Sequence, residues 1–189
     1  MYTNPSNICK TLINLLEMNS MQINKVIRDF TSSKSLVVLE GMRATLPVDM
    51  YPSFEIEPTG ADNVWATTRA QRPNYNFTCT LTVKVDNVKY GVDYICTVAN
   101  AISEIMTSPN NLQMRILNET KWSPDGGLGD TYILDSLISN ATYDATRDGS
   151  VRTAEFQWFA TVHEPFPDSK FVIGDSVTPT VLRPKVITL

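Results

Sequence analysis

The chain lacks the features that mark metal enzymes, nucleic-acid binders and membrane-spanning proteins. Its 189 residues include one histidine, His163, which excludes a multi-histidine metal site. The basic residues are scattered and the formal net charge is −4, which does not favour binding to nucleic acid. No stretch reaches the roughly 18 apolar residues that cross a bilayer, so we expect no membrane partner.

Cysteine is also scarce, with only Cys9, Cys79 and Cys96. Three is an odd number, and the spacing is not that of metal ligands. The first residues, MYTNPSNICK, lack the basic and then apolar segments of a signal peptide. We therefore expect reduced thiols, a cytoplasmic site of synthesis and no cofactor.

Groups suited to catalysis are few. His163 stands beside Glu164, but nothing local suggests that it activates one of the cysteines as a nucleophile. The DGGLGD stretch at 125–130 has glycines that could approach a phosphate, yet it lacks the lysine of a phosphate-binding loop. Its aspartates do not have the spacing of a helix-loop-helix calcium site. We expect no enzyme, and a hydrolase built on His163 is the least favoured hypothesis.

Charge of either sign is limited as well. Only 19% of the residues are charged, while 42% are hydrophobic, which is a globular composition with a weakly charged surface. One explanation is that part of the surface is buried against partner proteins. The other is a β-rich domain that uses threonine and asparagine as its surface residues. Composition leaves both explanations open.

The helices are predicted from apolar residues spaced three and four apart. Such a stripe runs from residue 7 to 30, with Asn7 or Ser6 as its cap and a weak point at Asn19-Ser20 that could divide it into two helices. A second stripe runs from 93 to 106, with Asp93 as its cap.

The strands are predicted from β-branched content and from alternation of apolar with polar residues. Pro58, Gly60 and Asp62 predict a turn between two of them, and Asp148-Gly149 predicts a tight turn. The expected strands are residues 36–41, 53–57, 64–69, 74–85, 112–117, 131–138 and 150–162.

Helices alternating with runs of strands predict an α+β fold. We expect a mixed, mainly antiparallel sheet with two main helices packed on one face. A single domain would cover 1–168, and 169–189 would form an extended C-terminal arm, because Pro179 and Pro184 exclude a central strand there.

One strand, within RPNYNFTCTLTVKV at 72–85, has an unusual polar face. Its apolar positions are explained by packing against the helices. The polar positions include Thr78, Thr80 and Thr82 and a single lysine, fewer charges than a free surface usually carries. We predict that these threonines lie at or near a subunit contact or a channel wall.

The order of elements resembles the tail terminator (tail-completion) proteins of long-tailed bacteriophages. The resemblance rests on layout across residues 7–165. An amphipathic helix at 7–30 leads to SLVVLEG and LPVDMYPSFEIEP. The long strand YNFTCTLTVKV then runs into the helix DYICTVANAISEIM, and a later strand pair ends in VRTAEFQWFATVHEP.

The resemblance implies a structural virion protein, assembled in the cytoplasm of a bacterial host. Such proteins form a homo-oligomeric ring, usually a hexamer, at the head–tail neck. The ring caps the tail tube, joins it to the head connector or adaptor and in some cases contacts the sheath. DNA passes through its channel without specific binding. The alternative hypothesis is a small-molecule or peptide-binding α+β domain with a pocket near the 118–130 loop.

Three further residues are candidates for contact with partners. Trp122 is an aromatic residue in a predicted loop, where an exposed ring suits an interface. Leu182 and Val186 belong to the arm, which could add to the sheet edge of a neighbouring copy.

Overall fold

The computed structural model describes residues 3–31, 35–41, 51–66, 70–85, 88–108, 131–146 and 149–165. The elements follow in the order α1 (Pro5–Met18), α2 (Ser20–Arg28), β1 (Val37–Glu40), β2 (Ser53–Ala66), β3 (Ala70–Lys84), the 3-10 turn η2 (Val88–Tyr90), α3 (Gly91–Thr107), β4 (Tyr132–Ala145) and β5 (Val151–Pro165). The expected strand at 112–117, the 118–130 loop and the 169–189 arm lie outside the described residues.

The first helical stripe is divided in two, as its weak point predicted. Asn19 ends α1, and its side-chain amide donates to the carbonyl of Leu15, 2.9 Å away. The predicted cap at Ser6 or Asn7 is wrong, because the cap is Asn4, whose side chain accepts from the amide of Ser6. Pro5 occupies the first turn, where the missing amide hydrogen costs nothing.

The start of α3 also differs from the prediction. The helix begins at Gly91, and Asp93 lies in its first turn, where a negative charge suits the helix dipole but does not cap. Gly91 lets the helix start close to β3, since an added Cβ would lie only 3.2 Å from Val85. The predicted end is confirmed, with Ser108 as the C-cap.

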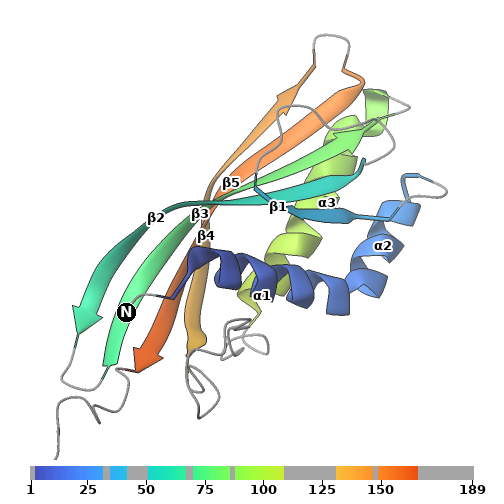
Figure 1. The fold of residues 1–189 in the computed structure, drawn as a ribbon. Helices are drawn as coiled ribbons and strands as arrows, with labels where there is room; N and C mark the ends of the chain where they lie inside the picture. The colour runs from blue at the N-terminus through green and yellow to red at the C-terminus, as the bar shows by residue number, and fades with distance from the viewer. Residues whose placement is uncertain are drawn as a thin grey trace, which may run out of the picture.

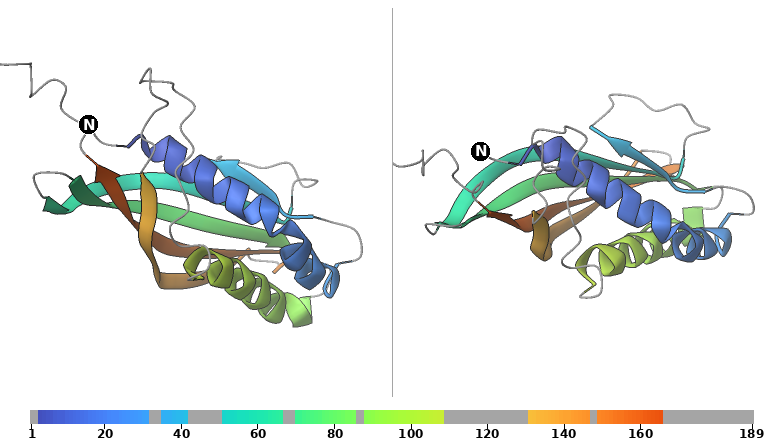
Figure 2. Two further views of the ribbon diagram at one scale, coloured as in Figure 1. Left: turned by 90° about the horizontal axis from the view of Figure 1, so that it is seen from below. Right: turned by 60° about the horizontal axis from the view of Figure 1, so that its bottom comes forward.

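The predicted fold class is confirmed. The strands form one sheet in the order β1-β2-β3-β5-β4, in which β1 pairs in parallel with β2 and all other pairs are antiparallel. Two long hairpins, β2–β3 and β4–β5, extend toward opposite ends of this twisted sheet (Figure 1). Helix α1 contacts β1 and β2, α3 contacts β3, β4 and β5, and α2 packs on α3, so the helices form one layer (Figure 2).

The second strand corrects the predicted turn at Pro58, Gly60 and Asp62. Residues 53–66 form one continuous strand paired with β3, and the register shifts between Pro58 and Gly60 and again between Asn63 and Trp65. The strand β1 pairs only with Ser53–Ile56. Beyond that point β2 is an edge strand, where a proline and a bulge are tolerated.

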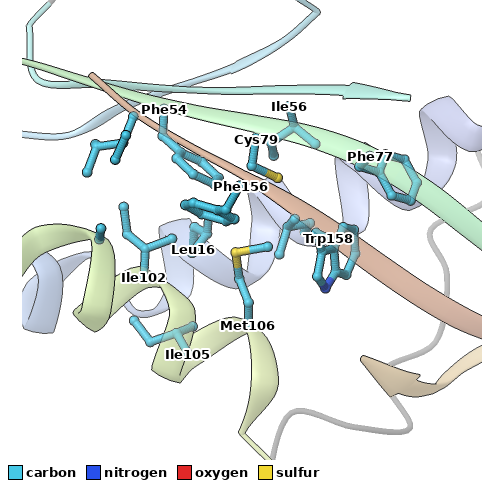
Figure 3. Close-up of a cluster of buried hydrophobic side chains, with 14 of the residues drawn as sticks. Leu16, Phe54, Ile56, Phe77, Cys79, Ile102, Ile105, Met106, Phe156 and Trp158 are labelled. Carbon is cyan, nitrogen blue, oxygen red and sulfur yellow. The ribbon is translucent and has the colours of Figure 1, made fainter. Parts of the chain in front are cut away.

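The core lies between the sheet and the helix layer (Figure 3). Trp158 is 1% exposed, as predicted, and its ring centre lies 4.9 Å from that of Phe77. Phe54 and Phe156 form a second ring pair, at 5.8 Å. Each such side chain contributes roughly 1.5–3 kcal/mol through burial. None of the described helices is long and apolar enough to cross a membrane.

Candidate interaction surface

The face of the sheet opposite the helices, called the outer face below, contains the predicted threonines in one row. The register places Thr78 between Glu57 and Gln157 on the neighbouring strands. In the same way Thr80 lies between Glu55 and Glu155, and Thr82 between Ser53 and Thr153. The sequence prediction that these side chains share a polar face is therefore confirmed, while their role at a subunit contact stays a prediction.

This row is already partly shielded from water in a single copy. Thr82 is 8% exposed, and its neighbour Ser53 is fully buried. The Gln157 side-chain amide donates to the hydroxyl of Thr78 at 3.0 Å. By contrast, the hydroxyl of Thr80 and the side-chain amide oxygen of Asn76 are buried with no hydrogen-bond partner in the described part of the chain. Buried polar atoms are normally paired, so these two have hydrogen-bonding capacity left for a water or a partner group.

The outer face is acidic. Among the described residues, the strand registers place six acidic and two basic side chains on it. Glu55 is buried among them, and the exposed members are concentrated on β4 and β5. The eight are Glu55, Glu57, Asp62, Asp135, Asp144, Glu155, Arg72 and Lys84.

One apolar spot interrupts this acidic surface. Leu137 of β4 is 61% exposed, and the register sets it directly beside Phe159 of β5. Asp135 and Glu155 lie on the same face of the same two strands. Phe159 is half-buried, so an exposed leucine on a partly exposed ring, with a charged border, has the composition of an interface centre with a polar rim.

The inner face ends in a buried carboxylate that sequence reasoning missed. Glu164 is 2% exposed and accepts from the Thr3 amide at 2.7 Å and the Gln71 side chain at 2.6 Å. The Tyr75 hydroxyl lies 2.7 Å from Glu164 and 3.0 Å from the Thr3 carbonyl oxygen, and its one proton serves either acceptor. The alternation of β5 contained the signal, because Glu164 follows Val162 by two residues and so points inward.

This arrangement joins the first described residues to the end of β5. Three hydrogen-bond donors replace the water that the Glu164 carboxylate loses on burial. We therefore interpret the cluster of Thr3, Gln71, Tyr75 and Glu164, called the buried clasp below, as structural. Burial, followed by the hydrogen bond and the charge of Glu164, raises the pKa of Tyr75. That hydroxyl therefore remains protonated at neutral pH.

The candidate catalytic groups do not come together. His163 is half-buried, and its ring stacks on Tyr132 with 5.0 Å between centres. Burial, with the nearby charge of Glu40, raises the pKa of Cys9 to about 12. Burial, followed by the charge of Cys9, also raises the pKa of Cys79. Both thiols therefore stay protonated, which makes them poor nucleophiles. Within the described ranges, no three His, Cys, Asp or Glu residues lie close enough to hold a metal ion.

The remaining predicted sites fall outside the described residues. These are Trp122, Leu182 and Val186, together with the 118–130 loop that the pocket hypothesis needs. Of the predicted contact residues, only Thr78, Thr80 and Thr82 of the outer face therefore lie in the described part of the chain.

Comparison with known proteins identifies a similar fold. No family model matches the chain, and no curated protein matches its sequence. Among solved structures, it is similar to a chain in the virion of a native gene transfer agent particle, with a TM-score of 0.51 and 9% sequence identity. The similarity covers 86% of this chain and 99% of that chain. At this identity the match shows that the two chains share a fold.

Proposed function

We propose that this chain is a structural virion protein of a long-tailed, phage-like particle. The observation that carries the proposal is the similarity over 99% of a chain that belongs to a virion. The low overall share of charged residues and the partly buried threonine row of the outer face fit a protein that works by packing against other proteins. In this proposal the chain has no enzymatic activity and no cofactor.

The finer proposal is a tail terminator. Copies of the chain form a hexameric ring at the head–tail neck, cap the tail tube and offer a docking face to the head connector or adaptor, with the sheath as a further neighbour. DNA passes through the ring without specific binding, because an acidic protein does not neutralise phosphate charge. The order of helices and strands supports this assignment, and the threonine row is its proposed subunit contact or channel wall.

The ring is tested by measuring the mass of the purified chain with light scattering across a range of concentrations, with electron microscopy of the same sample. A ring of about six copies is expected for a tail terminator. A monomer at every accessible concentration would contradict the ring.

The role of the arm is tested by deleting residues 169–189. In this proposal the arm adds to a neighbouring copy, so the deletion should weaken assembly while the melting temperature changes little. Unchanged oligomer mass after the deletion would remove the arm from the contact and leave the ring itself standing.

A further inference from the structure

Helix α2 has an exposed stripe that complements the outer face. Met21, Lys25 and Arg28 are spaced four and three residues apart, which places them on one side of the helix. All three are exposed, Met21 by 85%. The opposite side of α2 is fixed in the core by Ile23 and Ile27, so the stripe faces away from the core.

Met18, at the end of α1, is a second exposed methionine and lies three residues before Met21 in the chain. It is 71% exposed and directly precedes the break between the two helices. We name Met18, Met21, Lys25 and Arg28 the helix stripe. Basic residues in a last turn also stabilise a helix through its dipole. That effect explains Lys25 and Arg28 but does not explain two exposed methionines beside them.

The outer face supplies the opposite combination. We name Asp135, Leu137, Glu155 and Phe159 the sheet patch, in which an apolar pair lies between two exposed acidic residues. Neither Lys25 and Arg28 in the stripe nor Asp135 and Glu155 in the patch form an ion pair within the described part of the chain. Each set thus combines apolar side chains with charged ones, which are basic in the helix stripe and acidic in the sheet patch.

We propose that the helix stripe of one copy packs against the sheet patch of the next copy. This inference rests on the proposed ring and specifies its subunit contact. Charge decides the pairing, because two acidic sheet patches repel each other across a two-fold contact. Helix α2 lies in the helix layer on one side of the sheet (Figure 2), and the strand registers place the sheet patch on the outer face, on the other side. Two different surfaces on different sides of one chain give a head-to-tail contact, which forms a ring when the rotation between neighbouring copies closes and an open filament when it does not.

Reversal of charge tests this pairing. One variant of the full chain contains Lys25→Glu and Arg28→Glu, and a second contains Asp135→Lys and Glu155→Lys. Each variant alone presents two surfaces of like charge, so its dissociation constant for assembly should rise about 10-fold or more. Glu104→Lys, on an exposed position of α3, is the matched control and should assemble normally. Circular dichroism and the melting temperature establish that each variant is folded.

Rescue makes the test specific. Mixing the two variants brings each reversed surface against a reversed complement, so rings of alternating copies should return. A chain with all four substitutions should also assemble by itself. Assembly that is lost and rescued in neither experiment would overturn the pairing of these surfaces. Assembly unaffected by either double substitution would overturn it as well, with the ring itself intact. A wild-type chain that never assembles would instead overturn the proposed function, and this inference with it.

Discussion

The two faces of the central sheet obey the same alternation and bury their side chains for different reasons. On the inner face, Phe77, Phe156 and Trp158 are almost fully enclosed by the helices. On the outer face, Thr80 and Thr82 are shielded mainly by neighbouring strands, and the Thr80 hydroxyl lacks a partner in the described part of the chain. The apolar side chains of the inner face are covered by the helices of the same copy, whereas the described helices leave the outer face uncovered.

The largest difference in the free energy of unfolding is expected between alanine substitutions at two neighbouring residues of β5, Phe156 and Gln157. Replacing Phe156 with alanine leaves a cavity on the inner face and should lower the free energy of unfolding by about 3–5 kcal/mol. Gln157→Ala, one residue on and on the outer face, removes the hydrogen bond to Thr78 and should cost about 0.5–1.5 kcal/mol. Denaturant unfolding of both variants measures the difference. Equal losses would show that the outer face contributes to stability as the core does.

A smaller effect is expected at the buried clasp. Tyr75→Phe removes a donor to the Glu164 carboxylate and should cost about 1–3 kcal/mol at pH 7. Tyr90→Phe is the matched control, since this ring is 51% exposed and a surface change should cost less than about 0.5 kcal/mol.

The same variant tests a dependence on pH. The pKa of Tyr75 is raised by burial above its ordinary value of 10.0, so the folded chain holds a proton that the unfolded chain loses. Its contribution is complete below pH 10.0 and decreases as the pH rises beyond that value. Unfolding measured between pH 8 and 11 should show a shallower alkaline loss for Tyr75→Phe than for the wild type. Identical slopes would argue against this role of the hydroxyl.

The smallest effect on stability, and the sharpest test of the outer face, is expected from Thr80→Val. Valine has the same shape and removes a buried hydroxyl without a partner, so the free energy of unfolding should stay within about 1 kcal/mol or rise slightly. If the threonine row is a subunit contact, assembly should weaken even though the monomer is as stable as before. Light scattering and thermal unfolding of one sample separate these quantities, and a variant with normal assembly would place Thr80 outside the contact.

Sequence reasoning succeeded where alternation and burial coincide. In the middle of β3 and β5, from Tyr75 to Val83 and from Ala154 to Val162, every second residue is apolar and faces the helices, so period and environment agree. The break between α1 and α2 at Asn19 was also predictable from the sequence. An asparagine side chain hydrogen-bonds to nearby backbone groups, and these bonds compete with those of the helix.

Sequence reasoning failed where a strand has an exposed edge. Pro58 and Gly60 predict a turn, but pairing with β3 holds the chain extended and a bulge absorbs the irregularity. In β4, residues 139–145 lack a clear apolar alternation, yet they continue the strand as the edge partner of β5. Asn140 takes a positive φ of 55° there, which asparagine tolerates better than most residues.

The candidate surface was predictable only in part. Thr78, Thr80 and Thr82 could be placed on one face from their spacing alone. Their neighbours could not, because the register with β2 and β5 decides that Glu57, Glu155 and Ser53 stand beside them. The helix stripe is visible in the sequence as a spacing, but its meaning depends on the sheet patch, which joins residues from two strands.

The sequence by itself determined that this chain forms an α+β fold, that β3 has one apolar and one threonine-rich face, and that its composition favours neither metal chemistry nor nucleic-acid binding. These properties are local, since they follow from residue type and from periods of two and three to four. Only the tertiary structure decided that Glu164 closes a buried clasp with Thr3 and Tyr75, and that Leu137 meets Phe159 on an acidic face. Such contacts depend on which distant segments pair and in which register, and pairing is settled by packing of the whole chain.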